Sequence, residues 1–162
     1  MEKGNLQVYF GSGKGKTTAA IGQAVKAASR GKSVFIVQFL KERQPEEISF
    51  VQRLEPEIKL FRFQRREKAF QELEPSEQAE ETMNMKNGFN FAKKVLATGE
   101  CDVLILDEVL GLVDYGIETT EDIRALLEEV PDDVELIFTG NSFCPEIVEW
   151  ADCVYETTAL KE

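Results

Sequence analysis

The chain has 162 residues, 43% hydrophobic and 30% charged, a balance typical of one globular domain with its own core. It carries 30 acidic residues against 19 lysines and arginines, and the net charge of −11 disfavours nucleic acid and anionic lipid as partners. It has no histidine, which excludes catalysis by an imidazole base, and no apolar run long enough to span a membrane. We therefore predict a single domain over residues 1–162, and the lack of a secretory signal predicts a cytoplasmic location.

The first part of the chain alternates between strand and helix patterns. A short run of β-forming residues, 6–10, ends in glycines, and a helix is predicted over 16–30 with Gly31 placed to end it. Residues 33–40 are almost continuously apolar, as expected for a strand buried on both faces, and residues 58–63 predict a weaker strand. Loops or short helices are predicted for the charged stretches 41–57 and 64–74.

The second part of the chain continues this alternation. A long helix is predicted over 75–98, and a strand over 102–108 finishes in two acidic residues. Thr119 and Asp122 have the spacing of a capping box, which predicts a helix that runs to Glu129. The last elements are a strand over 134–140, a short helix over 145–151 and a strand over 153–156. Because strands alternate with helices, we predict an α/β fold with a mostly parallel sheet flanked by helices.

Between the first strand and the first helix lies the glycine-rich sequence GSGKGKTT. Such a loop turns its backbone N–H groups inward and, with the positive end of the following helix, forms a cradle for phosphate. Lys16 is expected to reach the terminal phosphates, and the Thr17 hydroxyl is expected to bind Mg²⁺. The common pattern has glycine at position 10, where this chain has Phe10, so the loop is a variant. The predicted phosphate-binding residues are Gly11, Ser12, Gly13, Lys14, Gly15, Lys16, Thr17 and Thr18.

A pair of acids closes the predicted strand at 102–108. Asp107 and Glu108 follow four apolar residues, at the carboxyl end of a strand, where ligands bind in parallel sheets. Either carboxylate is expected to hold the metal through its water shell or to orient a reactant, so the predicted metal site is Thr17, Asp107 and Glu108. With the phosphate loop, the acids predict one Mg-nucleotide-binding domain of the RecA-like P-loop NTPase class, a three-layer sandwich. These motifs do not select a reaction.

Most of the chain resembles one family, the P-loop ATP:corrinoid adenosyltransferases. The doubled GKGKTT, the VQFLK strand end and the LDE…DYG and TG…PE…AD series are together more specific than a phosphate loop alone. The resembling stretches are residues 11–41, 87–92, 103–116 and 136–156. In this family the cobalt(I) of a corrinoid attacks the 5′ carbon of ATP, and the whole triphosphate leaves. The resemblance therefore implies a loop that stabilises a leaving group instead of presenting a γ-phosphoryl group for transfer.

The resemblance also implies roles for individual side chains. The residues that match the family's phosphate and metal positions are Lys14, Lys16, Thr17 and Thr18. Glu108 matches the family's acid near the metal, and Lys26 stands where the family tends to have an arginine near the nucleoside. Phe89 and Phe91 match an aromatic pair that strips the lower axial ligand from cobalt, although their helical spacing alone is also typical of core residues. The resemblance thus assigns catalytic roles to Lys16, Glu108, Phe89 and Phe91.

The implied substrates are ATP and a corrinoid, either cobalamin or a precursor, with Mg²⁺ as the cofactor. An electron-donating flavoprotein or another reductase is the implied protein partner, and the family suggests a homodimer. Two other functions stay open on the motifs alone. One is a P-loop ATPase or small-molecule kinase, in which water or a hydroxyl attacks the γ-phosphorus. The other is a non-catalytic relative that binds nucleotide or corrinoid.

Overall fold

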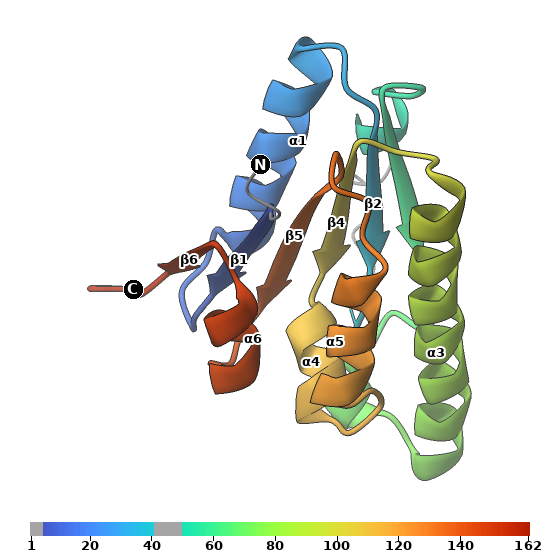
Figure 1. Ribbon diagram of the computed structural model, residues 1–162. Helices are drawn as coiled ribbons and strands as arrows, with labels where there is room; N and C mark the ends of the chain where they lie inside the picture. The colour runs from blue at the N-terminus through green and yellow to red at the C-terminus, as the bar shows by residue number, and fades with distance from the viewer. Residues whose placement is uncertain (1–4, 41–49) are drawn as a thin grey trace.

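A sheet of six strands forms the centre of the computed structural model, which describes residues 5–40 and 50–162 (Figure 1). The strands are β1 (Leu6–Phe10), β2 (Val34–Gln38), β3 (Ile58–Arg62), β4 (Val103–Asp107), β5 (Glu135–Gly140) and β6 (Cys153–Glu156). Their order across the sheet is β3-β2-β4-β5-β1-β6, and every neighbouring pair is parallel. The predicted parallel α/β sheet is confirmed, while residues 41–49 of the predicted loop lie outside the described residues.

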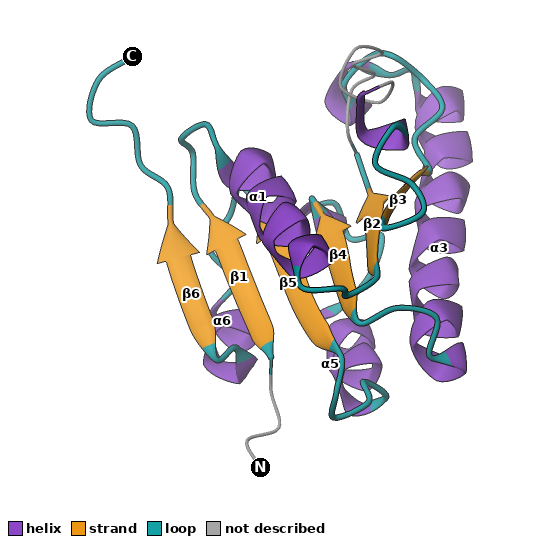
Figure 2. Ribbon diagram, turned by 90° about the horizontal axis from the view of Figure 1, so that it is seen from above, coloured by secondary structure: helices purple, strands orange, loops and turns teal. Residues whose placement is uncertain are grey.

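Helices cover both faces of this sheet. They are α1 (Lys16–Ser29), the 3-10 turn η1 (Phe70–Glu72), α3 (Pro75–Thr98), α4 (Val109–Asp114), α5 (Thr120–Glu128) and α6 (Pro145–Trp150). Helix α1 lies against one face, and α5 and α6 lie on the opposite side of the sheet (Figures 1 and 2). In the part of the chain that the structure describes, no helix is both long and apolar enough to cross a membrane.

The buried strand residues divide into two cores because successive side chains point to opposite faces. On β2, Val34 and Ile36 pack with the alanines of α1, and the small alanine side chains let this helix lie close to the sheet. Phe35 and Val37 point the other way, into the larger core that includes Phe89 of α3. The near-continuous apolar runs of the sequence therefore correspond to strands buried on both faces, as predicted.

Helix α4 was not expected from the sequence, whereas the turn η1 lies within the stretch 64–74 that was predicted as loop or short helix. Only Glu108 separates the end of β4 from the start of α4, and residues 103–113 are almost all apolar through both elements. A short apolar run gives no periodicity that would separate a buried strand from a buried helix, so the boundary at Glu108 is invisible in the sequence. The turn η1 has only three residues, too few to produce a pattern.

A glycine pair tests this packing. An added Cβ at Gly88 of α3 would lie 2.8 Å from a ring carbon of Phe63 and 2.9 Å from one of Phe39, whereas one at Gly22 of α1 would meet nothing within 4 Å. We expect Gly22→Ala to raise the free energy of unfolding by up to about 1 kcal/mol, since alanine is the better helix former. Gly88→Ala is expected to lower it by roughly 1–3 kcal/mol through overpacking. Urea denaturation of both variants measures this, and equal stabilisation of both would contradict the packing.

Because all six strands are parallel, their carboxyl ends lie along one edge of the sheet (Figure 2). The register brings Gln38, the last residue of β2, beside Asp107, the last residue of β4. It also brings Phe10, at the end of β1, beside Gly140, at the end of β5. The glycine-rich loop and the acid pair, which are about 90 positions apart in the sequence, therefore meet at this edge.

Candidate functional site

The glycine-rich loop runs from the end of β1 to the first turn of α1. Gly15 caps the helix with a φ of 104°, in the left-handed region that favours glycine. Lys16 is 8% exposed, and its Nζ donates a hydrogen bond to the carbonyl oxygen of Gly13 at 2.7 Å. Its charge is therefore held against the inside of the loop at the positive end of a helix, an arrangement that binds anions. The neighbouring predicted residues that are exposed to solvent are Ser12, Lys14, Gly15 and Thr18.

A fully buried carboxylate, that of Asp107, lies beside this loop. The Thr17 hydroxyl donates to its Oδ1 at 3.0 Å, and the Thr139 hydroxyl donates to the same oxygen at 2.6 Å. Gln38 Nε2 donates to Oδ2 at 3.2 Å. These donors come from α1, β5 and β2, so three elements orient one carboxylate toward the first turn of α1. The structure thus brings together Thr17 and Asp107, two of the three residues of the predicted metal site.

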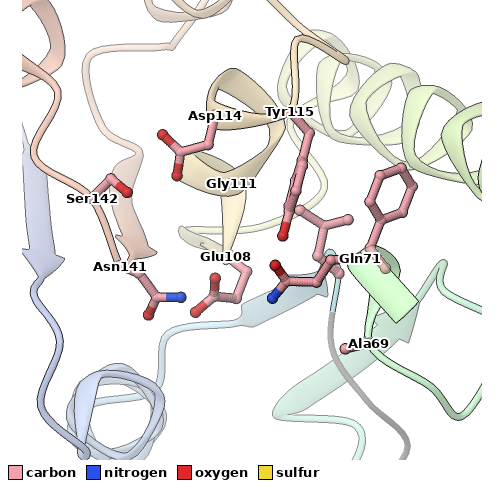
Figure 3. Close-up of a pocket in the computed structure, with 10 residues that line it drawn as sticks. Ala69, Gln71, Glu108, Gly111, Asp114, Tyr115, Asn141 and Ser142 are labelled. Atoms are coloured by element: carbon pink, nitrogen blue, oxygen red, sulfur yellow. The ribbon is translucent and has the colours of Figure 1, made fainter. Parts of the chain in front are cut away.

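The adjacent acid, Glu108, is the single residue between β4 and α4. Its backbone has a φ of 65°, and its N–H donates to the Thr139 hydroxyl at 2.8 Å. The side chain lines a cavity of about 770 Å³ (Figure 3). The left-handed backbone at the junction of β4 and α4 therefore turns two consecutive acids to two different places, one beside the loop and one in the cavity.

The cavity combines an aromatic wall with polar groups. Its lining residues are Leu40, Ala69, Phe70, Gln71, Glu108, Gly111, Asp114, Tyr115, Asn141 and Ser142. The rings of Phe70 and Tyr115 pack with their centroids 4.9 Å apart, which joins the turn η1 to the end of α4. Figure 3 shows Glu108, Gln71 and Asn141 directed toward the same space from different segments. A cavity of this size with a few convergent polar groups is typical of a small-molecule site.

Two residues other than glycine have a positive φ in the described ranges, and both line this cavity. Leu40 has a φ of 50° and Glu108 a φ of 65°. An L side chain in this region costs of order 1–3 kcal/mol, and such residues cluster at binding and catalytic sites. Cβ of an alanine at Gly111 would lie 2.7 Å from Leu40 Cδ1, so the strained leucine packs directly on α4. The cavity wall is therefore tightly constrained at its junction with β2 and β4.

Burial and the acids of this cavity raise the pKa of the Tyr115 phenol. Burial raises the pKa of Tyr115, and the negative charges of Asp114 and Glu108 raise this pKa further. The phenol therefore stays protonated at neutral pH and can donate a hydrogen bond into the cavity. It offers a ligand an apolar ring with a polar tip.

Three predicted site residues lie away from both the loop and the cavity. Lys26 is in the last turn of α1, about 15 Å along the helix from Lys16 at 1.5 Å per residue. Phe89 is completely buried in the core, and Phe91 is half-buried, with its ring centroid 4.7 Å from that of Phe61. Positions two apart on a helix point to different sides, so these two rings do not form one surface. The roles that the resemblance assigns to them stay predictions.

Sequence reasoning missed several residues of the site. Gln38 and Thr139 orient Asp107, and their only sequence signal is that each stands at or next to the carboxyl end of a predicted strand. Tyr115 belongs to the DYG stretch that carries part of the resemblance, but the motif alone assigns it no role. Phe70 had no signal, because it lies in a charged stretch predicted as loop or short helix.

A parallel sheet with a phosphate cradle after its first strand and a buried acid beside it defines a P-loop nucleotide-binding protein. The family model for the ATP:corrinoid adenosyltransferase BtuR/CobO/CobP matches residues 2–162. The chain is 34% identical to the corrinoid adenosyltransferase of Escherichia coli strain K12 and 32% identical to the corrinoid adenosyltransferase CobA of Salmonella typhimurium. Each alignment spans 160 residues, 99% of this chain and 79% of the relative. The chain belongs to the ATP:corrinoid adenosyltransferase family.

Comparison with solved structures agrees with the fold class. The KaiC-like protein PH0186 of Pyrococcus horikoshii OT3 superimposes with a TM-score of 0.56 at 19% identity. The match covers 87% of this chain and 64% of that protein, and at this identity it concerns the fold alone. It confirms the predicted RecA-like P-loop α/β architecture. Family membership in turn makes the chain a transferase whose substrates are ATP and a corrinoid.

Proposed function

We propose that the chain, as a single nucleotide-binding domain, holds the triphosphate of ATP at its phosphate loop and the corrinoid in the cavity beside Glu108. One observation carries this proposal: two consecutive residues, Asp107 and Glu108, join the phosphate loop to the cavity. Thr17 at the start of α1 donates to Asp107, and the next residue, Glu108, lines the cavity. Two substrates bound in these places would meet at the carboxyl edge of the sheet, where their reacting atoms can approach each other.

The proposed transfer forms one bond and breaks one. The cobalt(I) electron pair of the corrinoid forms a bond to the 5′ carbon of ATP, and cobalt(I) becomes cobalt(III). The bond from that carbon to the α-phosphate oxygen breaks, and its electrons leave with triphosphate. Negative charge therefore develops on the departing oxygen. Lys16 and the inward N–H groups of the loop are placed to stabilise this charge, and no proton transfer to or from histidine is needed.

The oxygen atoms beside the loop suit Mg²⁺. The Thr17 hydroxyl and the Asp107 carboxylate are hard oxygen ligands, 3.0 Å apart, at the first turn of α1. Mg²⁺ at nucleotide sites is usually held by one or two such groups together with phosphate oxygens and water. When bound, the ion would supply positive charge to the leaving triphosphate. Glu108, which follows Asp107 in the chain, would bind water molecules of the ion's coordination shell.

The cavity offers a corrinoid both kinds of contact that its surface presents. Leu40, Phe70 and Tyr115 supply an apolar wall for the flat ring system, and Gln71 and Asn141 supply amides for its polar side groups. The electron that produces cobalt(I) would come from a separate reductase, for which a flavoprotein is the expected class. We also propose that the enzyme acts in the cytoplasm and as a homodimer, as the family resemblance implied.

An anaerobic assay with MgATP and chemically reduced cob(I)alamin tests the reaction. We expect the cob(I)alamin spectrum to be replaced by that of adenosylcobalamin, at a rate that depends on the protein concentration. Hydrolysis of ATP with an unchanged corrinoid spectrum would instead identify an ATPase. Tight binding of both substrates with no turnover would identify a carrier.

Replacement of Tyr115 tests the corrinoid position. Tyr115→Ala is expected to raise the KM for the corrinoid about tenfold, which corresponds to a loss of roughly 1.4 kcal/mol of ring contact. The KM for ATP is expected to stay unchanged, because Tyr115 lies in the cavity and not at the loop. Tyr115→Phe keeps the ring and serves as the matched control. Equal changes in both KM values would contradict a corrinoid-specific position.

The same steady-state assay also decides the role assigned to Phe91. If the ring strips the axial ligand, Phe91→Ala will slow the reaction that starts from cob(II)alamin and spare the one that starts from prereduced cob(I)alamin. If the ring only packs on Phe61, the variant will lose stability and both reactions will keep their corrinoid KM. The comparison of the two starting states separates the roles.

A further inference from the structure

The segment Thr157–Ala159 follows β6 and lies against the phosphate loop. Thr157 N–H donates to the carbonyl oxygen of Phe10 at 2.8 Å, which continues the pairing of β6 with β1 beyond the last strand residue. The N–H of Gly13 then donates to the carbonyl oxygen of Thr157 at 3.0 Å. Figure 2 shows that the segments leaving β1 and β6 start from the same edge of the sheet. The chain after β6 is thus bound to the loop by its backbone.

This contact explains two of the three loop glycines. A Cβ at Gly11 would lie 2.2 Å from the Thr157 carbonyl oxygen. A Cβ at Gly13 would lie 3.0 Å from Thr157 Cγ2 and 3.1 Å from the Ala159 nitrogen. At Gly15 an added Cβ would meet nothing within 4 Å, and there the positive φ is what requires glycine. At Gly11 and Gly13 the segment therefore leaves no room for a side chain, and the positive φ of 128° at Gly11 also favours glycine.

The contact also fixes the direction of the loop peptides. Gly13 donates its N–H to Thr157, while its carbonyl oxygen accepts from Lys16 Nζ at 2.7 Å. The first half of the loop is thus held between the segment on one side and the lysine on the other. The N–H groups available to an anion are those of the second half, where the loop enters the first turn of α1. The shape of the cradle depends on a residue outside the loop.

We propose that Thr157–Ala159 is a positioning segment that holds the phosphate loop in its nucleotide-binding conformation. The inference rests on the proposed binding of the triphosphate at this loop. Without the segment, the loop would have to be ordered when the nucleotide binds, and that cost would appear as weaker binding. The hydrogen bonds between the segment and the loop are made by backbone groups, so they do not require a particular side chain at these positions.

Calorimetric titration with MgATP tests the proposal on shortened chains. A chain that ends at Glu156 lacks the segment, and the matched control ends at Leu160, whose side chain is 99% exposed. We expect the dissociation constant for MgATP to rise about three- to tenfold in the first chain, the range that corresponds to one lost hydrogen bond, and to stay unchanged in the second. Unchanged or tighter binding by the chain that ends at Glu156 would overturn the proposal.

A double-mutant cycle separates this effect from general damage. Gly13→Ala in the full chain places a methyl group against Thr157 and Ala159, so binding is expected to weaken at least as much as on truncation. In the chain that ends at Glu156 the same substitution has no clash, and we expect it to add less than a twofold loss. Independent, additive losses would overturn the proposal. Circular dichroism and thermal melting of each variant establish that it is folded.

Two further measurements complete the test. The first is hydrogen exchange in the full chain, which needs no variant. By linkage, bound MgATP is expected to slow exchange at the amides of Gly13 and Thr157. Equal exchange rates with and without nucleotide would contradict the coupling. Lys16→Ala distinguishes this inference from the proposed function. If Lys16→Ala binds MgATP as tightly as the unaltered chain, the loop is not the nucleotide site. If only that variant loses binding, the loop assignment stands and the positioning segment is wrong.

Discussion

Lys16→Ala is expected to lower kcat/KM for adenosyl transfer by about 10²- to 10³-fold, the loss typical when one preorganised donor to a developing negative charge is removed. Lys16 is almost completely buried, and its Nζ is held at the Gly13 carbonyl inside the loop. A charge fixed there interacts more strongly with the leaving triphosphate than a charge on a free surface side chain would. It also needs no reorganisation when the triphosphate leaves. Initial rates with prereduced corrinoid measure the effect without involving the reductase.

The control for this prediction is Lys94→Ala, an exposed lysine on α3, which is expected to keep the unaltered rate. Lys16→Arg adds a second comparison. It keeps the positive charge but replaces a compact ammonium by a larger planar group, so only partial recovery is expected. A kcat/KM for Lys16→Ala within a factor of two of the unaltered chain would contradict the role of the loop.

Asp107→Asn is expected to lower kcat about a hundredfold or more and to raise the Mg²⁺ concentration needed for half-maximal rate. The substitution keeps the shape but removes the negative charge that would hold the metal. It also replaces one acceptor oxygen by an NH₂ group, while Thr17, Gln38 and Thr139 all donate to this carboxylate. One donor is then left facing another donor, and a stability loss of roughly 1–3 kcal/mol is expected.

Titrations with Mg²⁺ and Mn²⁺ separate the two effects of Asp107→Asn. If the carboxylate is a metal ligand, the apparent metal affinity will fall even at temperatures where the variant is fully folded. Asp133→Asn, at an exposed position between α5 and β5, is the matched control and is expected to change neither affinity nor stability. A variant that loses stability but keeps its metal dependence would show that Asp107 only holds Thr17 in place.

Much of the fold could be predicted because its strands are short apolar runs between glycine-rich or charged stretches. The ends of α3 illustrate this. Pro75 is its first residue, and Gly99 ends it in the left-handed conformation. The predicted capping box of α5 is also confirmed, since Thr119 and Asp122 exchange hydrogen bonds. Helix α4 escaped prediction because a helix that directly continues a buried strand leaves no change of pattern at Glu108.

The site residues that could be predicted are those whose motif lies within one short stretch of the sequence. The phosphate loop carries its own motif, and Asp107 was found because it ends a strand. Gln38 and Thr139 could not be assigned, because their contact with Asp107 depends on the register between β2, β4 and β5. The contact between Thr157 and the loop depends in the same way on the pairing of β6 with β1. Interactions set by strand order and register are invisible in one sequence.

The most direct test of the central claim is the phosphate product, followed by ³¹P NMR during anaerobic turnover with MgATP and cob(I)alamin. The phosphate loop is proposed to hold a leaving group, so we expect one equivalent of triphosphate for each adenosylcobalamin formed, with no accumulation of ADP. Formation of ADP and inorganic phosphate in step with turnover would mean that the γ-phosphorus is attacked, and would contradict the account.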